Sequence, residues 1–280
     1  RVHATIAAAQ AAALRLPGRA PAILPRLFWR GFARILGLRV RVLGSAPAPG
    51  RPMVFVANHS SWLDIPVLGA ALEAAFVAKD EVSGWPVAGA VARVGGTVFV
   101  SRRRATAGAE RAAMAERLGA GRALILFLEG TTSDGSRVMP FRSAFLSLAD
   151  AEAAPLIVPV SVAYDRLADL PVGRAARPVL ACFGDTGIGE HFRRLAEHRR
   201  AGASVLVHPP IDAAAHPNRK ALTQAVWQAV ADGAAELRQG RIPASRIPAS
   251  RTPATPPPPT PPRTPDPPPP PSNPDGSAAP

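Results

Sequence analysis

Short apolar runs alternate with helix-like segments between residues 39 and 238. The expected strands are 39–43, 52–57, 74–78, 97–101, 122–128, 155–163, 178–183 and 203–209. The expected helices are 61–72, 84–94, 105–120, 142–152, 188–200 and 217–238. Alternation of this kind is typical of an α/β domain with a mostly parallel central sheet flanked by helices. We therefore predict one such domain at 45–240.

The last 40 residues differ in composition from the rest of the chain. Residues 241–280 hold 17 of the 33 prolines and almost no large apolar side chains. Such a segment cannot bury enough surface to offset the entropy lost on ordering. We expect a disordered, Pro-rich tail at 241–280.

Positive charge is concentrated ahead of the predicted domain. The chain carries a formal charge of +13, and residues 1–50 contain eight arginines but no Asp or Glu. In the predicted helix 26–38, Arg26, Arg30 and Arg34 form one stripe, and aromatic and aliphatic side chains fill most of the remaining surface. This pattern favours an amphipathic helix at a membrane interface. The alternative is a helix packed on the domain with exposed arginines.

We therefore assign residues 1–44 to a basic segment that associates with an anionic membrane surface, and we expect no nucleic-acid partner. No uncharged run reaches the ~18 residues that cross a bilayer, so peripheral or monotopic attachment is expected. Whether a membrane span precedes residue 1 is left open.

The single cysteine, Cys182, lies in an apolar run and is expected in the core. Because no thiol cluster or His pair has metal-ligand spacing, we expect no bound metal.

A histidine and a carboxylate lie five positions apart in the stretch NHSSWLD at 58–64, directly after an apolar run. A neutral imidazole with a carboxylate that fixes its tautomer can take a proton from a hydroxyl. On one regular helix the two side chains would lie roughly 140° apart, because each residue turns about 100°. His59 and Asp64 therefore meet only if His59 precedes a helix that opens near Ser60 or Ser61. The alternative is an ordinary surface pair.

Three further stretches end in groups that suit ligand binding. In the stretch 95–104, the expected strand 97–101 delivers Arg102 and two more arginines, which suit an anion. The apolar run 124–128 ends in Glu129 and Gly130, and ligands bind at strand ends of open α/β sheets. The run 156–162 contains Pro159, which needs an edge, bulge or ligand-facing position. For the first stretch the alternative is an ordinary basic loop end. For the second the alternative is a structural turn.

Taken in order, these four stretches resemble the conserved blocks of the glycerolipid acyltransferase family, which includes bacterial lysophospholipid acyltransferases. The first, at 58–64, matches the N-H-x4-D block in full. Gly96, Phe99 and Arg102 resemble the second block, residues 127–133 the third, and Val158-Pro159-Val160 the fourth. The resemblance covers roughly residues 25–235.

The resemblance implies an enzyme of phospholipid biosynthesis at the cytoplasmic face of the bacterial inner membrane. It implies acyl transfer from an acyl-carrier protein or coenzyme A thioester, without another cofactor, to the sn-2 hydroxyl of 1-acylglycerol 3-phosphate, which makes phosphatidate. His59 would be the general base and Asp64 would orient it, while Arg102 would hold the acceptor phosphate. Glu129, Gly130 and Thr131 would position the glycerol part of the acceptor.

Two departures from the family pattern leave the identity of the acceptor lipid undecided. The third block usually reads F-P-E-G-T-R-S, whereas here Leu128 replaces the proline and Thr132 replaces the arginine. Relatives thought to acylate lyso-ornithine lipid share the E-G-T-T-S-D-G pattern, so this lipid is the alternative acceptor.

An alternative of another class is a non-catalytic protein that binds lipid surfaces. A serine hydrolase is not favoured because no G-x-S-x-G occurs. His191 and His198 are interpreted as solvated.

Overall fold

A mixed β-sheet forms the centre of the part of the chain that the computed structural model describes, residues 20–48, 51–85, 88–100, 107–144, 146, 154–198 and 200–241. Within these ranges the strand order is β1-β8-β6-β2-β5-β3-β4, and β7 pairs with β6. The bounds are Leu38–Leu43 (β1), Met53–Ala57 (β2), Ala74–Lys79 (β3), Val98–Val100 (β4), Ala123–Phe127 (β5), Leu156–Leu167 (β6), Leu170–Pro171 (β7) and Ala201–Val207 (β8).

Most neighbouring strands run parallel. This holds from β6 through β2, β5 and β3 to β4, and also for β1 with β8. Only the pairings of β6 with β7 and with β8 are antiparallel among the described strands. The prediction of an α/β fold with a mostly parallel central sheet is confirmed.

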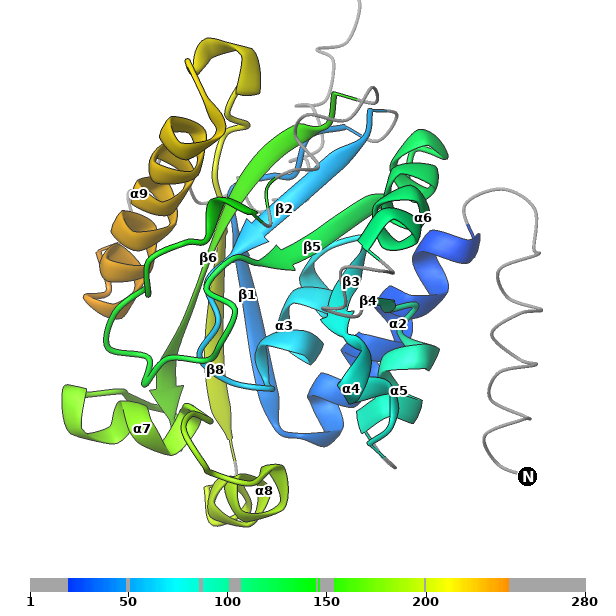
Figure 1. Cartoon of the computed structure of the whole chain (residues 1–280). Helices are drawn as coiled ribbons and strands as arrows, with labels where there is room; N and C mark the ends of the chain where they lie inside the picture. The colour runs from blue at the N-terminus through cyan, green and yellow to red at the C-terminus, as the bar shows by residue number, and fades with distance from the viewer. Residues whose placement is uncertain are drawn as a thin grey trace, which may run out of the picture. The chain divides into compact units, whose positions relative to one another are not determined.

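Helices cover both faces of the sheet (Figure 1). Their bounds are Ala20–Ile35 (α2), Asp64–Ala71 (α3), Asp80–Ser83 (α4), Ala88–Val94 (α5), Ala107–Gly119 (α6), Arg177–Leu180 (α7), Ile188–Ala196 (α8) and Arg219–Arg238 (α9). Successive side chains of β2 point to opposite faces, as the pleat requires. Phe55 shares a buried cluster with Trp29 of α2, whereas Val54 shares one with Leu118 of α6 and Val226 of α9.

Strand β2 lies in the interior of the sheet, and all five of its residues are buried. It pairs with β5 on one side and with β6 on the other. The turn that follows Ala57 therefore emerges at the carboxyl edge of β2 and β5, beside the middle of the longer strand β6. That edge is the usual ligand-binding edge of an open α/β sheet.

Some elements differ from the sequence-based expectation. The expected strand 178–183 is instead the short helix α7 followed by a loop. Pro178 lies in the first turn of α7, where its fixed φ suits a helix, while its missing N–H would interrupt a strand ladder. The expected helix 84–94 begins later than predicted, as α5, and a separate short helix, α4, precedes it. Most of the expected helix 142–152 lies outside the described residues.

Pro159 belongs to β6, between β2 and β8, and not to an edge strand. Its carbonyl accepts a hydrogen bond from the backbone N–H of His208 at 3.0 Å, one residue past the end of β8. The missing N–H of the proline therefore falls where the ladder to β8 ends, which explains why the sheet tolerates it.

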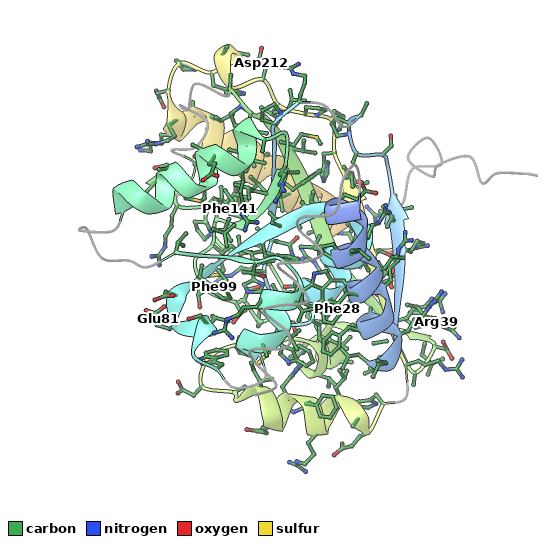
Figure 2. All side chains as sticks on the ribbon, turned by 90° about the vertical axis from the view of Figure 1, so that its right-hand side faces the viewer. Phe28, Arg39, Glu81, Phe99, Phe141 and Asp212 are labelled. Atoms are coloured by element: carbon green, nitrogen blue, oxygen red, sulfur yellow. The ribbon has the colours of Figure 1, made fainter. Side chains whose placement is uncertain are left out.

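Helix α2 packs on the sheet through the fully buried Trp29, and Phe28 projects from α2 into the same layer of side chains (Figure 2). Arg26 and Arg30 donate through Nε to the carbonyl of Ala70 at the end of α3, at 3.3 and 3.2 Å. Arg26 also pairs with Glu73 at 2.8 Å. Two of the three arginines of the stripe therefore bind the neighbouring helix end, as in the alternative of a packed helix.

Other apolar side chains of α2, namely Leu24, Leu27 and Ile35, remain exposed. Strand β1, which also belongs to segment 1–44, pairs along its whole length with β8. Among the described residues of this segment, the exposed side of α2 offers a surface to a membrane. Within the described residues, no helix has the length and apolar character to span a bilayer.

Candidate active site

His59 lies in the turn between β2 and α3, and Asp64 is the first residue of α3. The imidazole Nδ1 and the carboxylate Oδ2 are 2.8 Å apart. The two side chains meet because His59 precedes the helix, as the spacing predicts. The helix opens later than expected, and its N-cap is Leu63, which provides no side-chain cap.

Asp64 is fully buried, and its carboxylate is surrounded by donors. Oδ2 accepts from the backbone N–H groups of Ser60 and Ser61 at 2.8 and 3.0 Å. Oδ1 accepts from the hydroxyl of Tyr164 at 2.7 Å. These donors offset the cost of burying the charged form. Because an ionised carboxylate only accepts hydrogen bonds, the proton on His59 is placed on Nδ1, which leaves Nε2 as a free acceptor.

Tyr164 keeps its proton in this environment. Burial raises the pKa of its hydroxyl well above the ordinary value, and the negative charge of Asp64 and the hydrogen bond to it act in the same direction. The hydroxyl is therefore a permanent donor to Asp64. Tyr164 was not among the site residues inferred from the sequence, since it lies 100 positions from Asp64 and no motif links the two.

Glu129 holds the backbone of His59. Its Oε1 accepts from the N–H of His59 at 2.6 Å, and its Oε2 accepts from the N–H of Met139 at 2.8 Å. Burial raises the pKa of this carboxyl to about 7, although both backbone hydrogen bonds act to lower it. Each carboxyl oxygen therefore has a protein donor, and the described contacts of Glu129 position the His59 turn.

An apolar ring supports the imidazole from one face. The rings of His59 and Phe127 stack with centroids 4.0 Å apart and planes 15° apart, and Phe127 stacks in turn on Phe76. The His59 side chain remains 19% exposed. The ring is thus held by Asp64 and Phe127 while a part of it stays accessible to a ligand.

The third sequence block folds against the first. The N–H of Ser133 donates to the carbonyl of His59 at 2.9 Å, and Gly130 adopts a positive φ of 73°, which favours glycine at this turn. Thr131 is exposed beside it. These residues therefore lie at the same edge as His59, whereas Arg102 lies outside the described residues.

The interpretation of His191 as solvated is wrong, because this side chain is completely buried. Its Nδ1 accepts from the indole Nε1 of Trp62 at 2.8 Å, and its Nε2 donates to the carbonyl of Val179 at 3.1 Å. Burial lowers the pKa of the imidazole, which favours this neutral form. His191 thereby connects α8 to the His59–Asp64 segment.

The arrangement can accept a proton from a hydroxyl at Nε2 of His59 and stabilise the resulting imidazolium through Asp64. Within the described residues, no group of three or more His, Cys, Asp or Glu side chains could hold a metal ion. Fold and site together define an α/β protein with a hydrogen-bonded His–Asp pair at the carboxyl edge of its sheet.

Comparisons with known proteins specify the family. The model of the Acyltransferase family matches residues 39–163. A lyso-ornithine lipid O-acyltransferase of Brucella abortus is 39% identical over 208 residues, which cover 72% of this chain and 78% of that protein. A 1-acyl-sn-glycerol-3-phosphate acyltransferase of Neisseria meningitidis is 32% identical over 72% of this chain and 76% of that protein. The chain belongs to the Acyltransferase family and is a lysophospholipid-type acyltransferase, which confirms the resemblance.

A solved structure has the same fold. The crystal structure of the 1-acyl-sn-glycerophosphate acyltransferase PlsC from Thermotoga maritima aligns with a TM-score of 0.60 and 24% sequence identity. The alignment covers 81% of this chain and 85% of that one. The match therefore extends over the α/β domain as a whole.

Proposed function

We propose that this protein transfers a fatty acyl group from an acyl thioester to the free hydroxyl of lyso-ornithine lipid, with His59 as the general base. Asp64 holds Nδ1 of His59, so that Nε2 faces the acceptor. This hydrogen bond of 2.8 Å to a fully buried carboxylate is the observation that carries the proposal.

The reaction needs one proton acceptor and no covalent acyl-enzyme. Nε2 of His59 takes the proton of the acceptor hydroxyl as its oxygen attacks the thioester carbonyl. The C–O bond forms, the C–S bond breaks, and the departing thiolate receives the proton from the imidazolium. A positioned base of this kind contributes about 10²–10⁴-fold to the rate, and alignment of the two substrates supplies a further part of the acceleration.

The choice of acceptor rests on similarity and on one residue. Relatives named lyso-ornithine lipid O-acyltransferase have identities from 34% to 39%, against 32% and 34% for bacterial relatives named 1-acyl-sn-glycerol-3-phosphate acyltransferase. Thr132 also stands where the family pattern that handles a phosphate has arginine. These observations favour lyso-ornithine lipid over 1-acylglycerol 3-phosphate, the acceptor that the sequence analysis placed first. The latter is the second candidate.

The remaining partners follow from the chemistry. The donor is a thioester of coenzyme A or of acyl-carrier protein. Because the acceptor is a membrane lipid, we place the enzyme at the cytoplasmic face of a bacterial inner membrane. The exposed Leu24, Leu27 and Ile35 of α2 are the side chains available to enter that interface.

Release of free thiol from palmitoyl-coenzyme A tests the proposal, with lyso-ornithine lipid and 1-acylglycerol 3-phosphate compared as acceptors. We expect thiol release with lyso-ornithine lipid that falls at least 100-fold in His59→Ala. His216→Ala is the matched control, because His216 follows β8 at the opposite edge of the sheet, and it should keep full activity. Faster turnover of 1-acylglycerol 3-phosphate would reverse the order of acceptors. Activity that survives His59→Ala would contradict the mechanism.

A further inference from the structure

The imidazole of His59 forms one end of a row of aromatic rings. Its centroid lies 4.0 Å from that of Phe127, with the two planes 15° apart. Phe127 lies 6.2 Å from Phe76 with planes 18° apart, and Phe76 meets Trp29 of α2 edge to face at 6.0 Å. We call Trp29, Phe76 and Phe127 the aromatic column. It connects the helix that packs on this face of the sheet to His59.

The register of the sheet builds the column. Phe127, the last residue of β5, pairs with Ala57, and His59 follows Ala57 by two positions. Phe76 pairs with Ile125, two positions before Phe127. Because side chains alternate between the two faces of a strand, Phe76 and Phe127 project from the same face. That is the face on which α2 packs.

Trp29 fixes the far end of the column by packing. Its side chain is 1% exposed, and a methyl group added to Gly69 of α3 or to Gly95 before β4 would overlap the indole ring. Within the described part of the chain, the indole Nε1 has no hydrogen-bond partner, so the shape of the site alone holds the ring. A core packed this densely resists displacement. Phe76 therefore has a fixed seat between Trp29 and Phe127.

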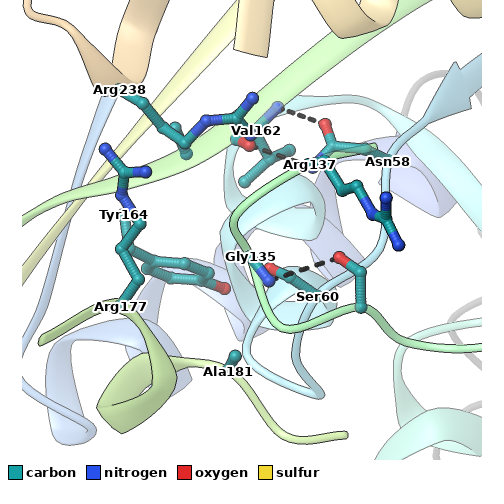
Figure 3. A pocket seen from close by; sticks show the side chains of 11 residues that line it. Asn58, Ser60, Gly135, Arg137, Val162, Tyr164, Arg177, Ala181 and Arg238 are labelled. Carbon is teal, nitrogen blue, oxygen red and sulfur yellow. Dashed lines mark hydrogen bonds between the residues drawn. The ribbon is translucent and has the colours of Figure 1, made fainter. Parts of the chain in front are cut away.

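Phe127 restrains the imidazole in a way that the hydrogen bond to Asp64 does not. A bond at Nδ1 holds the ring at one point and permits it to tilt about that bond. The nearby pocket is lined by Ser60 and Tyr164 among others but not by His59 (Figure 3), so the imidazole is not part of its wall. The stacked face of Phe127 restricts the tilt and, with it, the direction of Nε2.

Phe127 also faces the charge that develops during the reaction. When Nε2 takes the proton of the acceptor hydroxyl, the imidazole becomes a cation above the face of a benzene ring. That face carries partial negative charge and attracts cations within about 6 Å of the ring centroid. The attraction is much weaker for a neutral imidazole. It therefore lowers the barrier without strengthening the binding of either substrate.

We propose that Phe76 is a positioning residue for His59 that acts through Phe127, an inference that rests on the proposed acyl transfer. Phe127 touches the base, keeps Nε2 aimed at the acceptor hydroxyl and stabilises the imidazolium. Phe76 keeps Phe127 at stacking distance, and Trp29 holds Phe76 in place. The packing of α2 on the sheet thereby sets the position of the base.

Steady-state kinetics of Phe127→Leu and Phe76→Leu test the inference. Thiol release is measured with palmitoyl-coenzyme A and lyso-ornithine lipid, each varied while the other saturates. We expect kcat to fall about tenfold in Phe127→Leu, as loss of a desolvated cation–π contact predicts, and about threefold in Phe76→Leu. Both KM values should stay unchanged. Phe127→Tyr retains the ring at a position that is only partly buried, and it should match the wild type.

Phe55→Leu is the matched control. Phe55 belongs to the same buried cluster as Phe76 and is equally inaccessible to solvent, but among the described residues it has no ring contact with the column. The substitution removes the same atoms from the same core. It should therefore lower the melting temperature as Phe76→Leu does and leave kcat unchanged.

A double variant separates positioning from a general loss of stability. If Phe76 acts through Phe127, adding Phe76→Leu to Phe127→Leu should lower kcat no further, whereas independent effects would multiply. Thermal melting verifies that each variant folds. Multiplying effects, or a Phe76→Leu variant with the kcat of the wild type, would overturn the positioning role and leave acyl transfer intact.

A readout that needs no turnover distinguishes this inference from the proposed function. The NMR signals of the imidazole C–H groups of His59, identified by their loss in His59→Ala, are shifted by the ring current of the stacked Phe127. We expect them to move in Phe127→Leu and Phe76→Leu and to keep their position in Phe55→Leu. Signals that ignore Phe76→Leu would overturn the column, whether or not the wild type is active. An inactive wild type that shows the expected shifts would overturn the transfer reaction but support the column.

Discussion

The hydroxyl of Tyr164 lies 2.7 Å from Oδ1 of Asp64, while His59 contacts the other oxygen of the same carboxylate. Tyr164 is fixed on the central strand β6, so the hydrogen bond ties the beginning of α3 to the sheet. The carboxylate that orients the base is thereby held from both sides. We infer that Tyr164 is a positioning residue for the His59–Asp64 pair.

Replacing Tyr164 with Phe should lower kcat about tenfold and leave KM for the donor unchanged. The reason is that the carboxylate loses one donor and gains freedom to rotate, at a cost of about 1–3 kcal/mol for the unpaired buried group. The measurement is thiol release at saturating substrates, together with urea unfolding. Thr223→Val, which removes another buried hydroxyl that donates within α9, should affect stability only. Equal activity of Tyr164→Phe and wild type would exclude the positioning role.

Asp64→Asn should lower kcat by at least 100-fold while the protein remains folded. An amide at this position cannot accept all the donors that surround the carboxylate, and it no longer favours the tautomer with a proton on Nδ1 of His59. Initial rates across pH 6–9 measure the effect. Asp165→Asn is the control, since Asp165 pairs with Arg41 on a partly exposed surface and such pairs contribute little. A loss below tenfold in Asp64→Asn would mean that the carboxylate does not orient the base.

The raised pKa of Glu129 predicts a pH-dependent stability. The folded-state value is about 7 against an ordinary value of 4.5, so the folded protein binds this proton more tightly than the unfolded chain. The favourable contribution is complete below pH 4.5 and disappears as the pH rises through 7. The difference corresponds to about 3 kcal/mol.

Glu129→Gln removes this titration, although its single oxygen can accept only one of the two backbone donors. We expect the variant to be less stable than the wild type at pH 5, and the gap between them to shrink or reverse at pH 8. Urea unfolding at both pH values measures it. A gap that stays constant between the two pH values would show that Glu129 does not titrate in this range.

The packing of α2 against α3 depends on a glycine. A methyl group on Gly69 of α3 would overlap the indole ring of Trp29. Gly69→Ala should therefore destabilise the protein by about 1–3 kcal/mol, although alanine is the better helix former. Gly119→Ala at the end of α6 is the matched control, because no atom lies within 4 Å of the added methyl group. The melting temperatures of both variants are compared with that of the wild type. A Gly69→Ala variant as stable as the wild type would indicate that α2 shifts to make room for the methyl group.

Several features followed from sequence patterns because they depend on local periodicity and spacing. Apolar runs marked most strands of the sheet, and the five-residue spacing of His59 and Asp64 required the histidine to precede the helix. The prediction of a strand at 178–183 is wrong because an apolar run alone does not distinguish a strand from a short buried helix and loop. The charged neighbours of His191 along the chain indicate a solvated side chain, whereas its burial is decided by tertiary contacts such as that with Trp62.

The amino-acid sequence by itself determined the α/β class, the family and the pairing of His59 with Asp64, because each is encoded in local pattern or in a contiguous motif. The tertiary structure alone decided how groups from distant parts of the chain surround that pair. Tyr164 comes from β6 and Glu129 from the turn after β5. They meet the His59–Asp64 segment only because β2 lies between β6 and β5 in the sheet. No spacing along the chain encodes that convergence.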